Sequence, residues 1–260
     1  MTLLSDEDPR AVEIYNPIEV CKATDAVPGL LLCEHAGQEI PLSLKSLGLS
    51  SDSLDTHIAY DIGAENTAKN IARALSVMLI IQRYSRLVID CNRPPEAADS
   101  IPEISHGTSI PGNRQLSDIE KQQRVEEIFN PLDHTINEHF ANNSVRWAFS
   151  IHSFTPELNG KQRPWDLGLL FRNDTSTAIS MAEYASVNYP LINIGLNQPY
   201  EIEDQSDWFI PQHAEKHRIA NCLIEIRNDH IRTVSGQQKW AAIVADLIRH
   251  SVGNASMPDI

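Results

Sequence analysis

Short runs of apolar residues recur along this 260-residue chain, separated by longer stretches in which apolar residues return at helical spacing. Runs of about four to eight apolar residues bounded by turn-forming residues are typical of buried β-strands. The pattern therefore predicts strands at residues 29–33, 79–82, 87–90, 147–152, 167–171, 192–195 and 222–227.

The stretches between these runs predict helices. Residues 64–77 carry apolar side chains on one helical face. Ser117 and Glu120 match a capping box, in which both side chains satisfy free backbone N–H groups at a helix start. We expect the helix that begins there to continue to about Phe140 and to kink at Pro131. Further helices are predicted over residues 175–187, 206–217 and 235–251.

Strands that alternate with helices indicate a layered α/β domain with helices on both faces of a mainly parallel sheet. We expect one domain over residues 1–260, in which residues 1–15 form a poorly ordered or peripheral segment. Residues 94–116 are rich in Pro, Gly, Ser and Asn and predict a long loop. Loops of this length in compact domains are often functional.

The formal net charge of −14 argues against a nucleic-acid surface, because phosphate binding depends on lysine and arginine. This net negative charge is compatible with a local basic pocket that binds a small anionic substrate. No apolar run approaches the ~18 residues that span a bilayer, and the acidic residues 1–10 are unlike a signal peptide. The cysteines at positions 21, 33, 91 and 222 include no Cys-x-x-Cys pair, which favours a reducing compartment. We therefore expect a cytoplasmic protein without membrane or nucleic-acid partners.

Four predicted strands carry, at or near their ends, residues able to take part in catalysis or metal binding. In parallel sheets, functional sites gather at the ends of the strands. His35 follows the first strand, His152 ends the run that begins at Trp147, and Glu225 lies within the last strand. Asp90 opens the fourth group, Asp-Cys-Asn-Arg-Pro. Each has an ordinary structural explanation when taken alone, such as a hydrogen-bonded histidine, a turn-capping aspartate or a glutamate paired with a neighbouring arginine.

Together these residue types form a coherent catalytic set. Catalytic zinc sites use three ligands from His, Asp and Glu, and keep a fourth position for water. The metal lowers the pKa of that water and polarises a carbonyl group, while a nearby glutamate moves the proton. Arginine suits a substrate carboxylate because its fork donates two parallel hydrogen bonds.

The same motifs, in this order, resemble the N-formylglutamate amidohydrolase family from about residue 29 to residue 231. The Asp-x-Asn-Arg and Glu-Ile-Arg elements are the more specific ones. The motifs that carry the resemblance are Cys-Glu-His35-Ala-Gly, Ile-Pro41, Ala59-Tyr-Asp61-Ile-Gly-Ala64, Ser85-Arg86-Leu-Val-Ile-Asp90-Cys-Asn92-Arg93-Pro, His152-Ser-Phe, Asn197-Gln-Pro-Tyr200 and Ile224-Glu225-Ile-Arg227-Asn-Asp229.

This family is similar to zinc carboxypeptidases and aspartoacylases, so the resemblance implies a three-layer α/β/α, phosphorylase/hydrolase-like fold with a mixed, mainly parallel sheet. It also implies that His35 and His152 bind a divalent metal, most naturally Zn²⁺, and that Glu225 is the general base. Asn92 and Arg93 resemble the pair that holds a substrate carboxylate in those enzymes, and Arg86 would assist them.

The third metal ligand departs from the carboxypeptidase pattern, because position 38 is Gln rather than Glu. Asp61 is the preferred replacement, since formylglutamate hydrolases also carry an aspartate there. Glu39 and Glu34 remain open as alternatives. In the 103–116 loop, Arg114 is a candidate for a second substrate carboxylate, although it could equally be a solvent-exposed loop residue.

The leading hypothesis is hydrolysis of an N-acyl amino acid, with N-formyl-L-glutamate giving formate and glutamate. A second hypothesis makes Cys33 a nucleophile with His35 or His152 as its base. Its position beside Glu34, at the end of an apolar strand, is unfavourable for a thiolate. A third hypothesis is a scaffold that binds an amino-acid-like ligand without turnover.

Overall fold

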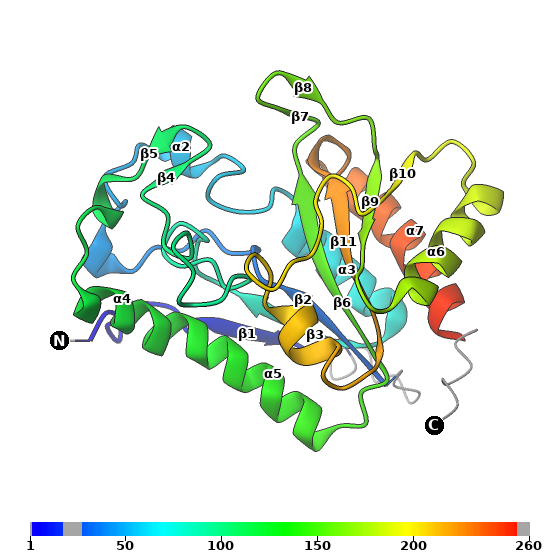
Figure 1. Ribbon diagram of the computed structural model, residues 1–260, viewed down its shortest axis with the longest axis horizontal. Helices are drawn as coiled ribbons and strands as arrows, with labels where there is room; N and C mark the ends of the chain where they lie inside the picture. The colour runs from blue at the N-terminus through cyan, green and yellow to red at the C-terminus, as the bar shows by residue number, and fades with distance from the viewer. Residues whose placement is uncertain (1, 18–27, 254–260) are drawn as a thin grey trace.

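The computed structural model describes residues 2–17 and 28–253, and its centre is a seven-stranded mixed sheet (Figure 1). Strands β3, β2, β6 and β11 are parallel, β1 is antiparallel to β3, and the pair β9–β10 runs antiparallel to β11. In spatial order the strands are β1 (Val12–Tyr15), β3 (Met78–Gln82), β2 (Gly29–Cys33), β6 (Trp147–Phe154), β11 (Ala220–Arg227), β9 (Leu167–Leu170) and β10 (Ile194–Leu196).

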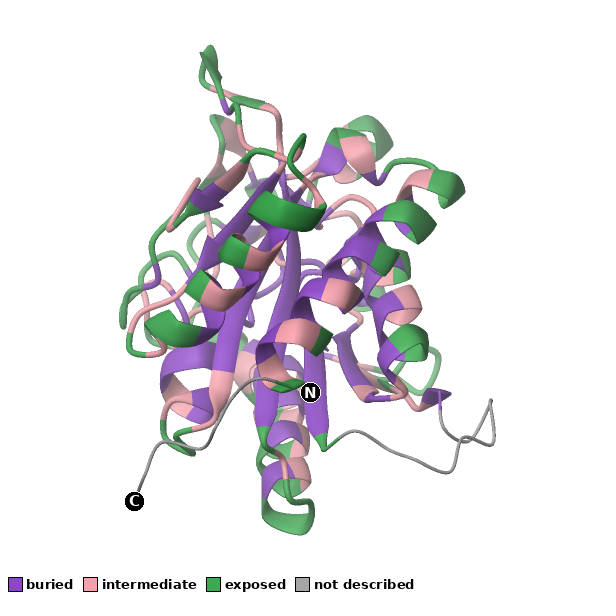
Figure 2. Cartoon of the chain, turned by 90° about the vertical axis from the view of Figure 1, so that its right-hand side faces the viewer, coloured by how far each residue is buried: buried purple, intermediate pink, exposed green. Residues whose placement is uncertain are grey.

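Helices cover both faces of this sheet. One face packs against α3 (Ala64–Leu75), α6 (Thr175–Asn188) and α7 (Val234–Gly253). The other packs against the π-helical turn η3 (Val125–Phe129), α5 (Asn130–Asn142) and the π-helical turn η4 (Ile210–Ala214), whereas α4 (Asp118–Arg124) is mostly exposed and precedes η3. Figure 2 shows the buried strands between partly exposed helices. The predicted three-layer α/β/α architecture is confirmed.

The central strands are apolar throughout because they are buried on both faces. In β2, Leu31 and Cys33 contribute to the core beneath α3, α6 and α7, whereas Leu30 and Leu32 contribute to the core beneath α5. All eight residues of β6 are buried. Six of the seven predicted strands are therefore present, with ends that differ by up to two residues.

The predicted strand at residues 87–90 is wrong. Its apolar side chains are buried, but the segment forms turns whose backbone groups bond within the turn and to side chains of other segments. The amide of Val88 donates to the Ser85 carbonyl, and the carbonyl of Val88 accepts from the guanidinium of Arg124. An apolar run in a buried loop thus has the same pattern as a strand.

The N-terminal residues lie at the edge of the sheet, and one predicted helix differs from expectation. Residues 12–15 form the edge strand β1, and the buried Leu3 bonds through its amide to Glu127, so these N-terminal residues pack against the domain. The helix predicted over residues 206–217 is reduced to η4 and adjoining turns.

The irregularity expected at Pro131 is a π-helical turn rather than a simple kink. Helix α4 begins at the predicted capping box of Ser117 and Glu120 and leads through η3 directly into α5. Pro131 lies in the first turn of α5. Because proline has no amide hydrogen and clashes with the preceding turn, a wider turn before it accommodates the residue.

The long loop at residues 94–116 contains the short hairpin β4 (Ile104–Ser105) and β5 (Thr108–Ser109). Cys33, Cys91 and Cys222 are buried free thiols, and Cys21 lies outside the described residues. Among residues 2–17 and 28–253, no helix is both long enough and apolar enough to cross a bilayer.

Candidate active site

The predicted catalytic residues meet where the parallel strands β2, β6 and β11 end. His35 lies in the turn after β2, and its carbonyl accepts a hydrogen bond of 2.8 Å from the amide of Asp61. His152 is part of β6 and faces Glu225 across the register of β11. This arrangement brings together residues from distant parts of the chain.

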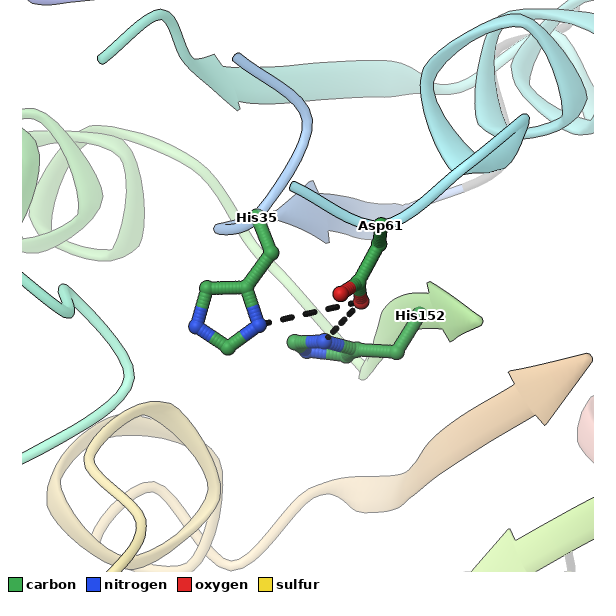
Figure 3. A group of neighbouring side chains, drawn as sticks. All are labelled: His35, Asp61 and His152. Atoms are coloured by element: carbon green, nitrogen blue, oxygen red, sulfur yellow. Dashed lines mark hydrogen bonds and ion pairs between the residues drawn. The ribbon is translucent and has the colours of Figure 1, made fainter. Parts of the chain in front are cut away.

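His35, Asp61 and His152 form one buried cluster, shown in Figure 3. Oδ2 of Asp61 lies 2.9 Å from Nδ1 of His152 and 3.7 Å from Nδ1 of His35. Tetrahedral zinc bonds of about 2.0–2.2 Å would place ligand atoms roughly 3.3–3.6 Å apart. These two separations bracket that range, and all three ligand atoms lie within 4.8 Å of one another, so the side chains would draw together to share one ion.

The opposite nitrogen of each imidazole faces a second carboxylate. Nε2 of His35 lies 2.7 Å from Oδ1 of Asp90, and Nε2 of His152 lies 3.1 Å from Oε2 of Glu34. A carboxylate on the far nitrogen of a metal-binding histidine fixes its tautomer and ring orientation. With Nε2 of His35 protonated toward Asp90, its Nδ1 has a free lone pair, and this buried atom has no hydrogen-bond partner.

Both carboxylates are themselves held in place. Arg86 donates to Oδ2 of Asp90 at 2.7 Å, and the hydroxyl of Ser150 in β6 donates to Glu34. Burial alone would raise the carboxyl pKa values, but Arg86 and His35 hold the pKa of Asp90 well below its usual range. The pKa of Glu34 is lowered in the same way by His152.

The cluster as a whole favours a cation. Although burial opposes the charged form, the charge of His35 and a hydrogen bond from His152 hold the pKa of Asp61 well below its usual range. Burial likewise lowers the pKa of His152, yet Glu34 and Asp61 outweigh it and raise that pKa well above 6.5. Two imidazole nitrogens and one carboxylate oxygen are a donor set that fits Zn²⁺.

Glu225 differs from these bonded carboxylates. It is only 7% exposed, and its Oε2 is buried without a hydrogen-bond partner. Burial raises its pKa to about 7, with His152 opposing the shift and Asp61 adding to it. A carboxyl group that titrates near neutral pH is suited to both accepting and donating a proton.

The predicted substrate-binding residues lie in different settings. Arg86 and Arg93 line a cavity of about 200 Å³ beside the cluster, whereas Arg114 is exposed and bonds to Ser109. The cavity is lined by His57, Ile58, Arg86, Leu87, Asp90, Arg93, Asp99, Pro102, Ile104, Ser105 and His106. Part of the predicted long loop therefore borders the site.

Asn92 and Arg93 make hydrogen bonds and ion pairs within the protein. The Asn92 amide group donates to Asp207 and accepts from the backbone of Trp208. Arg93 pairs with Asp99 at 2.9 Å and lies 3.6 Å from Asp90. Arg93 lines the cavity with its charge paired, whereas Asn92 is not among the lining residues.

Sequence reasoning did not identify the two carboxylates that face the far nitrogens of the histidines. The sequence offers Glu34 only as an alternative metal ligand, and Asp90 only as a motif residue or a turn cap. Arg163 was also missed, although its buried guanidinium bonds to the hydroxyl group of Tyr200 at 2.9 Å. No local sequence signal marks this arginine, because its environment is built by segments distant in the chain.

Residues 27–232 match the model of the N-formylglutamate amidohydrolase family. The chain belongs to this family. Its members are hydrolases of a non-peptide amide bond, and the chain is an enzyme of this class. No similar sequence was found among curated proteins.

Two solved structures share this fold. A gene product of Agrobacterium tumefaciens is 33% identical and superposes with a TM-score of 0.88, covering 96% of this chain and 98% of its own. An N-formylglutamate amidohydrolase from Ralstonia eutropha is 18% identical with a TM-score of 0.62, covering 94% and 98%. At that identity the second likeness concerns the fold of the family.

Proposed function

We propose that this amidohydrolase cleaves the N-acyl bond of an N-acyl amino acid, with N-formyl-L-glutamate as the leading substrate. The products would be formate and glutamate. The observation that carries the proposal is the convergence of His35, Asp61 and His152 beside Glu225, a buried carboxyl group with an unbonded oxygen. The likeness to a structure described as an N-formylglutamate amidohydrolase supports the choice of substrate.

His35, Asp61 and His152 would hold a divalent metal, with Zn²⁺ the leading candidate for this donor set. When bound, such an ion lowers the pKa of water and polarises a carbonyl group. Asp61 is favoured over Glu39 and Glu34 because its carboxylate lies between the two imidazoles. Glu34 lies on the far nitrogen of His152 and would orient that ligand.

Glu225 would move the proton during cleavage. In its ionised form it accepts a proton from the attacking water, and it then donates that proton to the nitrogen of the departing amino acid. Because Glu225 of β11 is paired with His152 of β6, its carboxyl group stays beside the proposed ligands.

The test combines metal analysis with an assay for formate. Purified protein is expected to contain one equivalent of divalent metal, lose activity on chelation and regain it with zinc. N-formyl-L-glutamate is compared with N-formyl and N-acetyl derivatives of other amino acids. Failure of metal-loaded protein to release formate from N-formyl-L-glutamate would overturn the substrate assignment. His35→Ala is expected to lower the metal content itself.

The Cys33 alternative is disfavoured by the position of its thiol. Cys33 is fully buried in the core, and burial together with the charges of Asp61 and Glu34 raises its pKa well above 9.0. A nucleophilic thiolate needs an accessible, electropositive setting. A binding protein without turnover is the remaining alternative, and a ligand retained unchanged by metal-loaded protein would favour it.

A further inference from the structure

We propose that Arg163, rather than the Asn92–Arg93 pair, binds the α-carboxylate of the N-acyl amino acid substrate. This inference rests on the proposed function, because it concerns recognition of that substrate. It assigns a specificity role to a residue outside the motifs that carry the family resemblance.

The first observation is that the two arginines lining the cavity beside the cluster, Arg86 and Arg93, already have carboxylate partners. Arg86 is bonded to Asp90 and lies 3.5 Å from Asp61. Arg93 is paired with Asp99. A substrate carboxylate that approached either arginine would have to compete with a carboxylate of the protein.

Arg163 is buried but has no such partner. It is 9% exposed, and among the described residues no carboxylate lies within ion-pairing distance of it. Its guanidinium donates to the hydroxyl group of Tyr200 at 2.9 Å and lies 4.9 Å from that ring centre and 5.9 Å from the ring of Phe154. Burial of a cation without an anion is costly, so an anionic ligand would offset that cost.

The surroundings of Arg163 place it at the site. Phe154 ends β6, two positions beyond the proposed ligand His152. The segment that carries Tyr200 passes close to Glu225, since a Cβ built on Gly168 would lie 2.1 Å from the Gln198 carbonyl oxygen and 3.2 Å from Cβ of Glu225. In the substrate, the α-carboxylate is the anionic group nearest the scissile amide. Because Arg163 is held close to Glu225, which would act on that amide, the α-carboxylate is assigned to Arg163.

The charge of Arg163 also reaches the cavity beside the cluster. Burial lowers the pKa values of His57 and His106, and the positive charges of both Arg86 and Arg163 lower them further. Both histidines line that cavity. Arg163 itself is not among the residues that line the cavity.

A small hairpin fixes the position of Arg163. Strands β7 (Glu157–Leu158) and β8 (Lys161–Gln162) project beyond the sheet above β6 and β9 (Figure 1). Arg163 follows β8 directly, and its amide donates to the Pro156 carbonyl at 2.8 Å, which closes the base of the hairpin. The backbone at Arg163 is thus held while its side chain turns toward Tyr200.

The test compares N-formyl-L-glutamate with N-formyl-4-aminobutyrate, which lacks only the α-carboxylate. For Arg163→Gln, kcat/KM with N-formyl-L-glutamate is expected to fall about 10- to 100-fold, mainly through KM, since charge-assisted hydrogen bonds are lost. The inhibition constant of N-formyl-4-aminobutyrate is expected to change by less than about threefold. Arg163→Lys should recover part of the loss, and Arg249→Gln, an exposed site on α7, is the matched control.

Three results would overturn the assignment. One is that Arg163→Gln weakens the binding of N-formyl-L-glutamate and of N-formyl-4-aminobutyrate equally, and another is that it weakens the binding of neither. The third is that Arg93→Gln alone weakens the binding of N-formyl-L-glutamate more than that of N-formyl-4-aminobutyrate. Circular dichroism and metal content establish folding, and Tyr200→Phe supplies a milder variant, expected to raise KM while preserving metal. Absence of formate release by the unmodified enzyme instead overturns the proposed function, independently of any Arg163 variant.

Discussion

Glu225 and His152 are direct neighbours in the sheet, paired in register between the parallel strands β11 and β6. Side chains at paired positions of adjacent strands point to the same face of a sheet. The strand pairing therefore fixes the proposed proton carrier beside a proposed metal ligand. A change of register by one residue would move Glu225 to the opposite face.

This placement predicts that Glu225→Gln separates catalysis from metal binding. The substitution retains the size of the side chain but removes the group that accepts a proton. We expect kcat to fall about 100-fold or more while metal content stays near that of the unmodified protein. Formate release and metal analysis on the same preparations measure both. Glu138→Gln, at an exposed position of α5, is the control, and full activity of Glu225→Gln would refute its role.

The carboxylates behind the histidines predict a different effect. Asp90→Asn and Glu34→Gln leave all three proposed ligands present but weaken the orientation of one imidazole each. We expect metal affinity to fall about 10- to 100-fold, as is typical when such supporting groups are changed. Competition with a chelator of known affinity measures the change.

The control for this pair is Asp246→Asn, whose carboxylate bonds to Tyr184 and Tyr189 away from the site. Metal affinity equal to that of the unmodified protein in both supporting variants would show that the histidines are oriented by packing alone. A loss in only one of them would identify the imidazole that depends on its carboxylate.

The central strands could be predicted because burial on both faces makes them continuously apolar. Edge strand β1 was missed, since Val12–Tyr15 is short, half-buried and interrupted by Glu13. Residues 87–90 gave the opposite error, because buried loops can also be apolar. Periodicity reports burial, and it identifies a strand only when the backbone partners are also known.

The candidate site was predictable in residue types but not in pairings. His35, His152 and Glu225 follow or lie within apolar runs, and Asp61 belongs to a motif. Which nitrogen faces which carboxylate depends on tertiary geometry. The same holds for Arg163, which is a solitary arginine in the sequence and acquires its environment only when β6 and the 197–200 segment meet.

Burial of the Cys33 thiol predicts that catalysis does not require it. Cys33→Ala is expected to change kcat by less than about twofold, because the thiol packs in the core beneath α3, α6 and α7. A modest loss of stability is expected from the smaller side chain. Steady-state assays and thermal unfolding measure the two effects. Complete loss of turnover in a folded, metal-containing variant would instead support a nucleophilic cysteine.

Asp133 of α5 predicts a pH-dependent contribution to stability. It accepts hydrogen bonds from Trp208 at 2.7 Å and from His213 at 2.8 Å. Burial would raise its pKa, but these donors hold it below the ordinary value of 3.8. A carboxyl group with a lowered folded-state pKa contributes stability above its unfolded pKa and loses it as pH falls through the folded value.

Asp133→Asn should therefore lower the free energy of unfolding at pH 7 by about 1 kcal/mol, a modest value because the carboxyl group is partly exposed. The difference from the unmodified protein should narrow as pH falls from about 4 to 2, where both forms carry an uncharged side chain. Urea unfolding at pH 7 and at pH 3 measures it. A difference that stays constant across this range would mean that the charge of Asp133 contributes nothing.

Gly168 of β9 predicts a link between strand packing and substrate binding. It pairs with Glu225 of β11, and a Cβ there would lie 2.1 Å from the Gln198 carbonyl oxygen and 3.2 Å from Cβ of Glu225. Gly168→Ala must therefore displace the backbone that leads to Tyr200, the residue that holds Arg163. We expect a loss of about 1–3 kcal/mol in stability and a higher KM for N-formyl-L-glutamate. Gly253→Ala, where an added Cβ meets nothing within 4 Å, is the control. An unchanged KM in a destabilised Gly168→Ala protein would show that the contact between Gly168 and the Gln198 carbonyl does not affect substrate recognition.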